Sequence, residues 1–149
     1  MSEMLTKSAA RNIFYGGTIF FFVIFIGLVA HSVNYANTVS ANTPVTASVE
    51  RGKKVWEKHA CIDCHTIIGE GAYFAPEVGN VFVRYGGDKD PKAARDAIKA
   101  WMKAQPSGVP GRRQMPQFNL SEQELDDLVD FLAWTNKIKT LDWPPNKAG

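Results

Sequence analysis

The chain has 149 residues, of which 17 are basic and 15 acidic, so its formal net charge is only +2. This length allows one domain of ordinary size with an appendage. Nucleic-acid-binding proteins concentrate basic residues on one face, and the balanced charge therefore argues against a nucleic-acid partner. The only cysteines are Cys61 and Cys64, which lie in one motif. If a cofactor takes both thiols, no disulfide within the chain remains to stabilise the fold.

A short polar N-terminus, residues 1–12, precedes an apolar stretch. Residues 13–30 carry no charge, and a helix of this length spans about 27 Å, close to the hydrocarbon thickness of a bilayer. We predict a transmembrane anchor helix over 13–31 that contacts membrane lipid. Lys7 and Arg11 precede it, which predicts a cytoplasmic N-terminus and an exported, periplasmic remainder.

A cleaved signal peptide is the alternative interpretation of this stretch. Its apolar region would be about 7–15 residues long and closely followed by small residues. Residues 39–41, Val-Ser-Ala, would be a cleavage site, but they lie well beyond the apolar run. The length of the run favours an uncleaved anchor.

Residues 32–47 are small, polar and uncharged, and Pro44 interrupts any helical pattern. We predict a linker here. His31 is expected to be an interfacial polar residue. The exported domain then occupies residues 48–149.

The central motif of this domain is Cys61-Ile62-Asp63-Cys64-His65. Two cysteines three positions apart with a histidine directly after the second form the c-type haem attachment pattern. On one helical turn both sulfur atoms reach the same porphyrin, and His65 then lies under the iron as its proximal ligand. We therefore predict one covalent haem c on Cys61 and Cys64.

Two other sites could use these residues. A thioredoxin-like dithiol would sit in a βαβ pattern, which is missing around the motif. A zinc site would have to use His59, Cys61, Cys64 and His65, whereas structural zinc sites usually join two separated ligand pairs. We expect His59 to face solvent.

Three amphipathic helices are predicted in this domain, with no convincing strands, which indicates an all-α haem domain. The first runs into Cys61 and carries Gly52, whose cost in mid-helix suggests close approach by another helix. Asp90-Pro91 is a typical helix start, and Ser121-Glu122-Gln123-Glu124 forms a capping box. The buried stripes expected from helical spacing are Val49, Gly52, Val55 and Trp56; Ala94, Ile98, Trp101 and Met102; and Leu125, Leu128, Val129 and Leu132.

Met115 is the predicted second axial ligand of the iron. Met1 and Met4 precede the anchor, and Met102 lies on an apolar helix stripe, where it would fill the core. Met115 instead sits in a loop between Gly111 and Pro116, where packing alone would not demand methionine. A His/Met pair raises the reduction potential relative to two histidines and leaves no open coordination site.

Charged groups near these elements have two interpretations each. Arg112 and Arg113 could neutralise haem propionates or remain solvated. The acidic residues of the last helix could steer a basic partner or form a solvated face; they are Glu122, Glu124, Asp126, Asp127 and Asp130.

The region from Ser48 to Lys139 resembles class I cytochromes c. The helix with Gly52 and Trp56, the C-x-x-C-H motif, Pro110-Gly111 before Met115 and the C-terminal helix carry this resemblance. In that family the first and last helices cross at the glycine. The resemblance implies contacts from Gly52 and Trp56 to Leu128, Phe131 or Leu132.

Nearly the whole chain also resembles the small cytochrome c subunits of bacterial nitric oxide reductases. The matching parts are the anchor, the string Thr66–Glu77 (TIIGEGAYFAPE), the run Val109–Phe118 and the tail Trp143–Asn146. The resemblance implies a large multi-helix partner containing haem b and non-haem iron, which reduces two NO to N2O. It also implies an interface calcium ion, for which Gly71 and Tyr73 are candidate oxygen ligands.

This resemblance implies a non-catalytic electron-transfer subunit that receives electrons from a periplasmic cytochrome c or small copper protein. Three alternatives stay open. They are the cytochrome subunit of a haem-copper oxygen reductase, a free tethered shuttle, which needs a longer and more flexible linker than the one predicted, and a haem gas sensor, which needs a vacant sixth site.

Overall fold

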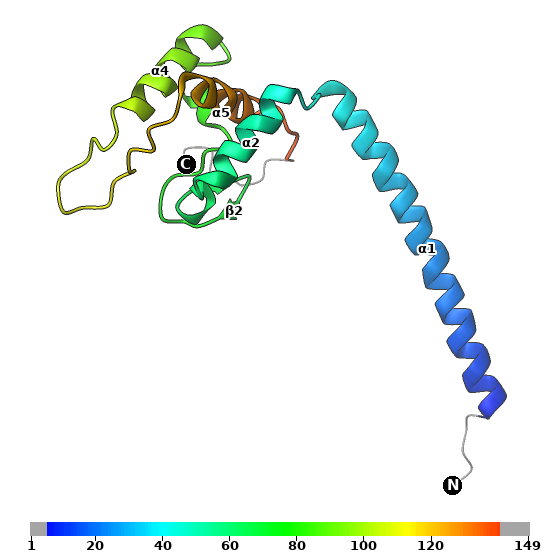
Figure 1. Ribbon diagram of the computed structural model, residues 1–149. Coiled ribbons are helices and arrows are strands. Elements are labelled where there is room, and N and C mark those ends of the chain that lie inside the picture. The colour runs from blue at the N-terminus through cyan, green and yellow to red at the C-terminus, as the bar shows by residue number, and fades with distance from the viewer. Residues whose placement is uncertain (1–5, 141–149) are drawn as a thin grey trace. The chain divides into compact units, whose positions relative to one another are not determined.

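The computed structural model describes residues 6–140, and the chain divides into two units after Pro44. The first unit is built from one helix, α1 (Lys7–Asn42) (Figure 1). Its part Lys7–Thr38 is long and apolar enough to cross a membrane. The predicted anchor, residues 13–31, lies inside it.

The helix extends further than the sequence predicted. Most of the expected linker, residues 32–42, continues α1, and only Thr43–Thr46 separate it from the next helix. The segment is uncharged and contains no proline before Pro44, and each added helical residue gains one hydrogen bond. Pro44 disfavours helical backbone at Thr43, which places the break there.

The second unit is mostly helical, as predicted. Its helices are α2 (Ala47–Lys58), the short α3 (Val81–Arg84), α4 (Pro91–Lys103) and α5 (Glu122–Thr135), with a 3-10 turn η1 (Cys61–Asp63) after α2. One correction concerns strands. A minimal antiparallel hairpin, β1 (Thr66–Ile67) and β2 (Glu70–Gly71), pairs Thr66 with Gly71. The sequence did not predict this hairpin, since two-residue strands leave no alternation to detect.

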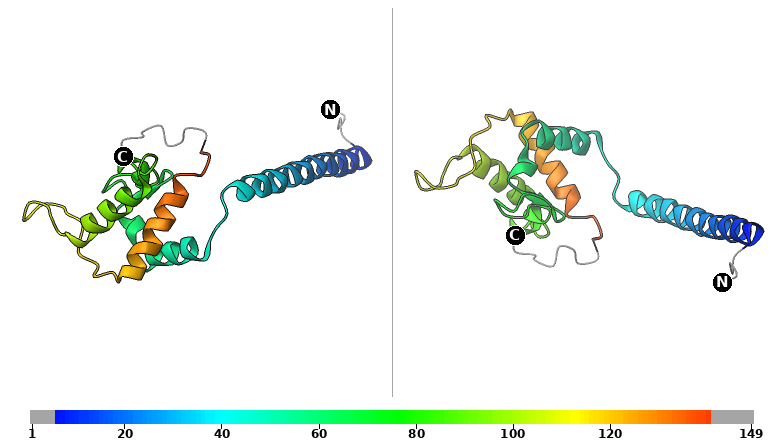
Figure 2. Two further views of the ribbon diagram at one scale, coloured as in Figure 1. Left: turned by 90° about the horizontal axis from the view of Figure 1, so that it is seen from above. Right: turned by 90° about the horizontal axis from the view of Figure 1, so that it is seen from below.

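Helix α5 is the centre of the second unit, because it contacts α2, α3 and α4 (Figures 1 and 2). At Gly52 a Cβ atom would lie 2.0 Å from the Asp127 carbonyl oxygen and 2.7 Å from the Phe131 Cβ atom. The rings of Trp56 and Phe131 are 6.3 Å apart. The predicted crossing at Gly52 is therefore confirmed, and only glycine permits it at this separation.

The helix caps agree with the sequence. Asp90 accepts the amide of Ala93 at the start of α4, and Ser121 and Glu124 form both bonds of a capping box on α5. Met102 is buried in the core as expected. Trp101 is the exception to the predicted stripe, since 43% of its surface is exposed.

The acidic residues of α5 are not a free solvated face. Asp127 is only 3% exposed and accepts hydrogen bonds from Arg51 at 2.8 and 2.7 Å. The other four acidic residues are paired with basic side chains: Glu122 with Lys99 and Lys103, Glu124 with Lys58, Asp126 with Lys99 and Arg95, and Asp130 with Arg95. This pairing weakens the case for steering a basic partner to α5.

Candidate haem site

The motif begins on a new turn and not, as predicted, at the end of a continuous helix. Helix α2 ends at Lys58, and Ala60 adopts left-handed backbone with φ 49°. This conformation ends helices and redirects the chain. The 3-10 turn then starts at Cys61, whose carbonyl accepts the amides of Cys64 at 3.2 Å and His65 at 2.9 Å. Cys61, Cys64 and His65 are thereby held on one tight turn.

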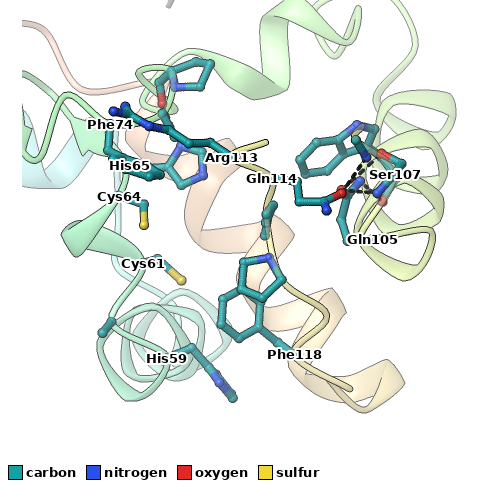
Figure 3. Close-up of a pocket in the computed structure, with 17 residues that line it drawn as sticks. His59, Cys61, Cys64, His65, Phe74, Gln105, Ser107, Arg113, Gln114 and Phe118 are labelled. Carbon is teal, nitrogen blue, oxygen red and sulfur yellow. Dashed lines mark hydrogen bonds between the residues drawn. The ribbon is translucent and has the colours of Figure 1, made fainter. Parts of the chain in front are cut away.

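The three motif side chains face a cavity of about 500 Å³. In Figure 3 they project toward its interior, and Arg113, Gln114 and Phe118 come from the loop on its other side. The volume lies within the roughly 300–1,000 Å³ of cofactor pockets. The lining residues come from the end of α2, the motif, the following loop, the end of α4 and the loop after it: His59, Ala60, Cys61, Cys64, His65, Phe74, Ala75, Pro76, Trp101, Gln105, Ser107, Gly108, Arg113, Gln114, Met115, Pro116 and Phe118.

The ring of His65 is oriented by the backbone. Its Nδ1 atom lies 2.7 Å from the carbonyl oxygen of Pro76. A carbonyl only accepts, so Nδ1 carries the proton and donates, and Nε2 keeps a free lone pair. That lone pair is the one a metal requires.

Met115 lines the same cavity and packs partly against the core. The loop that carries it is fixed by glutamine side chains as well as by its prolines. Gln105 is 6% exposed; its amide donates to the Trp101 carbonyl at 2.8 Å and its oxygen accepts from Ser107, as Figure 3 shows. Gln117 donates to the carbonyls of Lys103 and Gln105 at 2.8 and 2.9 Å. These contacts tie the loop to the C-terminal end of α4 and to itself.

His59 does not face solvent as the sequence predicted. The residue is partly buried, lines the cavity and contacts Phe118 edge to face at 5.3 Å between ring centroids. Its Nε2 atom is buried, and no hydrogen-bond partner for it exists among the residues that the structure describes. The turn at Ala60 redirects the chain that follows, so the motif closes around His59 instead of continuing the helix away from it.

The alternatives to haem find no support in the site. Burial raises the pKa of the Cys61 thiol to about 11, whereas dithiol oxidoreductases need a lowered cysteine pKa. Within residues 6–140, no three His, Cys, Asp or Glu side chains are grouped to hold a metal ion. A redox dithiol and a four-ligand zinc site are both disfavoured.

Arg113, but not Arg112, lines the cavity, and its guanidinium lies 4.2 Å from the centroid of the Phe74 ring. Gly71 and Tyr73, the calcium candidates, lie on the hairpin and the loop after it and are not among the lining residues. Tyr73 is 80% exposed, and its hydroxyl donates to the Gly69 carbonyl at 3.2 Å. The tail Trp143–Asn146 lies outside the described residues.

The chemistry of the cavity fits a haem c. It presents two thiols on one turn, an imidazole with a free Nε2, a thioether and a mainly apolar wall. A planar apolar macrocycle with a central metal needs this combination. The sequence did not predict that Trp101, Gln105 and Phe118 would line the cavity. Their proximity to Pro106 and Pro116, which bound the ligand loop, is the signal that could have identified them.

Comparisons with known proteins agree with this geometry. Residues 49–136 match the cytochrome c family model. The chain is 57% identical over 149 residues to the C subunit of the nitric oxide reductase of Stutzerimonas stutzeri, with all of both chains covered. It is 55% identical over 150 residues to the corresponding C subunits of Halomonas halodenitrificans and Paracoccus denitrificans, again with both chains fully covered.

Proposed function

Because the chain belongs to the family of nitric oxide reductase C subunits and carries their cytochrome c domain, we propose that it passes electrons from a periplasmic donor to haem b of a large catalytic subunit. That partner reduces two NO to N2O. Like its homologues, the chain is a non-catalytic electron-transfer subunit. The observation that carries the proposal is the convergence of Cys61, Cys64, His65 and Met115 on one cavity.

Each of these residues has a separate role in holding the haem. Cys61 and Cys64 would form the two thioether links, His65 would ligate through Nε2, and Met115 would supply the sixth ligand. When bound, the haem supplies an iron that alternates between the ferric and ferrous states and so carries one electron. With His65 and Met115 both holding the iron, no position would be left open for NO, and its reduction would belong to the partner.

The chain's own residues prepare the site. The Pro76 carbonyl holds the His65 tautomer, the glutamine contacts hold the Met115 loop, and the apolar wall excludes water. A low-dielectric, preorganised surrounding limits the rearrangement that accompanies a change of iron charge. These properties suit an electron carrier.

The topology is part of the proposal. Lys7 and Arg11 precede the apolar part of α1, which favours a cytoplasmic N-terminus and a periplasmic haem domain in the inner membrane. The donor is a soluble cytochrome c or a small copper protein. Since the acidic residues of α5 are paired, we expect its docking near the cavity mouth to depend little on α5.

An interface calcium ion is a further part of the proposal. The Gly71 carbonyl and the Tyr73 hydroxyl are oxygen donors of the type calcium prefers, but calcium takes about six to eight oxygens. The partner would have to supply most of them. Tyr73→Phe removes one donor atom and is expected to lower the calcium content of the purified complex, measured by mass spectrometry, with Tyr85→Phe as control.

Gly71→Ala is not a clean test of this calcium site. Gly71 has φ +123°, and an added Cβ would lie 2.4 Å from the His65 carbonyl oxygen. Such a variant would disturb the motif itself. Unchanged calcium content in Tyr73→Phe would contradict a role for its hydroxyl.

The function is tested by affinity purification through this chain in mild detergent, followed by haem and metal analysis. Co-purified haem b with non-haem iron and NO reductase activity is the expected result. Copper in the partner would instead identify a haem-copper oxygen reductase, and a chain without a partner would identify a tethered shuttle. Binding of NO or CO to the isolated ferrous protein would indicate a sensor.

A further inference from the structure

Glu77 is a buried carboxylate in the loop that follows the haem motif, with only 8% of its surface exposed. Its Oε1 atom accepts the amides of Ile68 at 2.8 Å and Gly79 at 2.7 Å, and Oε2 accepts the amide of Gly69 at 3.0 Å. The Thr66 hydroxyl also donates to it. The Glu77 carboxylate thus accepts hydrogen bonds from both ends of the segment 66–79.

The electrostatics agree with an ionised carboxylate. Burial raises the pKa of Glu77, but the hydrogen bonds from Gly69, Gly79, Thr66 and Ile68 outweigh burial and lower the pKa below its ordinary value. Several amide donors stabilise the charged form of a carboxyl group in this way. Glu77 therefore remains an acceptor for all four donors at neutral pH.

The loop that Glu77 holds is not in a relaxed conformation. Ile68 has φ 53° and Gly69 has φ 81°, and left-handed backbone is unusual for a β-branched residue. Such a strained conformation persists only where other contacts impose it. The two successive amides donate to the same carboxylate, so Glu77 supplies those contacts. At Gly79 a Cβ would lie 2.7 Å from Oε1, so a side chain there would push against the carboxylate.

Glu77 is directly connected to the proximal ligand. The Pro76 carbonyl that accepts from His65 Nδ1 belongs to the same planar peptide unit as the Glu77 nitrogen and Cα. Anchoring the Glu77 side chain holds its Cα in place, and this restricts how far the Pro76 carbonyl can move away from His65. On the other side, the Glu77 carbonyl accepts from the Arg84 guanidinium. Hydrogen bonds therefore hold both the side chain and the backbone carbonyl of Glu77.

We propose that Glu77 is a positioning residue that aims the Pro76 carbonyl at His65 and thereby sets how strongly His65 donates to the haem iron. This inference rests on the proposed function, since it presupposes a haem on the motif. A hydrogen bond to the second nitrogen orients a ligating histidine and raises its basicity. A more basic imidazole stabilises the ferric state, so loosening the Pro76 carbonyl raises the reduction potential.

The test compares Glu77→Gln with Glu70→Gln in the full chain purified with its partner. Both variants remove one carboxylate from the same loop, but Glu70 is exposed. Glutamine is nearly isosteric with glutamate, yet its amide nitrogen cannot accept one of the three backbone amides. Glu77→Ala removes all of these contacts and serves as the stronger variant.

Three quantities are measured on each protein: the reduction potential of haem c, the electron paramagnetic resonance g-values of the ferric haem, and the unfolding midpoint. We expect the potential to rise and the g-values to shift in Glu77→Gln, more so in Glu77→Ala, and neither to change in Glu70→Gln. A lowered midpoint with unchanged potential and g-values in Glu77→Gln would overturn the proposal, because it would show a purely structural role.

Failure of the proposed function would look different. It would appear in the wild-type protein, as a missing haem c or a missing catalytic partner. The Glu77 proposal concerns only the His65 side of the iron, so it can be judged whichever residue is the sixth ligand.

Discussion

The helix crossing and the haem cavity of the second unit are built on opposite principles. At the crossing, α2 and α5 approach so closely that Gly52 has no room for a Cβ atom, and the core residues around it are nearly all below one-tenth exposed. At the cavity, loops supply most of the wall, and Phe74 and Trp101 remain 50% and 43% exposed. The crossing therefore tolerates little change in residue size, whereas the cavity leaves room for a cofactor.

The largest effect is expected from Gly52→Ala, which breaks the crossing. The new Cβ would lie 2.0 Å from the Asp127 carbonyl oxygen, and a backbone atom in a packed helix cannot move aside. We expect a loss of about 3 kcal/mol, the upper end of the usual range, in the free energy of unfolding, measured by chemical denaturation with tryptophan fluorescence. Lys53→Ala, exposed on the same helix, is the control; a Gly52→Ala protein as stable as this control would show that the helices can separate cheaply.

Variants of two methionines distinguish the core around the helix crossing from the haem cavity most directly. Met102 is 8% exposed in the core, so Met102→Ala should cost about 3 kcal/mol of stability and leave the haem spectrum unchanged. Met115 lines the cavity, so Met115→Ala should abolish the His/Met low-spin spectrum and lower the potential. Optical spectra and redox titration of both variants check this. An unchanged spectrum in Met115→Ala would refute its assignment as ligand.

Asp127 links α2 and α5 at the crossing, and Asp127→Ala should cost about 2 kcal/mol, the value of hydrogen bonds to a charged group. The Arg51 hydrogen bonds, which outweigh burial, together with those from Ser48 and Gln123, lower the pKa of Asp127 from 3.8 to about 2. A lowered folded-state pKa contributes stability that is present above pH 3.8 and is lost as the pH falls through about 2.

Acid denaturation of the wild type, followed by fluorescence, should therefore include a loss of stability in this window that Asp127→Ala lacks. Asp126→Ala is the matched control because its side chain is 44% exposed, and exposed ion pairs contribute less than about 1 kcal/mol. Equal acid profiles for wild type and Asp127→Ala would contradict the assignment.

The smallest effect concerns the cap of α5. Ser121 accepts the amide of Glu124, and Ser121→Ala should cost about 1 kcal/mol with no change in haem potential. Ser107→Ala, in the loop of the cavity wall, should cost less than about 0.5 kcal/mol, because the backbone amide of Ser107 still donates to Gln105. Denaturation midpoints of the two serine variants decide between these expectations and an equal cost at both positions.

The sequence predicted features that depend on local chemistry. The caps at Asp90 and Ser121, the stripes of α2 and α5 and the close approach at Gly52 all follow from residue type and spacing, and the structure confirms them. It also brings Cys61, Cys64, His65 and Met115 to one cavity, although haem attachment through the two cysteines and iron ligation by His65 and Met115 are proposals.

Other features depend on single backbone dihedrals and on contacts distant in sequence. The left-handed turn at Ala60, next to the half-buried His59, has no signature because alanine rarely adopts it. The hairpin at Thr66 and the burial of Glu77 depend on loop closure rather than on a repeating pattern. The exposure of Trp101 follows from the cavity beside it, which helical spacing alone does not reveal.

The break between α1 and α2 is confined to Thr43–Thr46. Even fully extended, such a segment spans only about 14 Å. A haem domain on so short a tether samples a small volume around the end of its anchor, so a partner beside that anchor meets it at a very high effective concentration. An acceptor elsewhere in the membrane has to wait for lateral diffusion of the whole chain. Under the proposed function, so short a tether would favour an acceptor beside the anchor through proximity, even where the binding surface itself is weak.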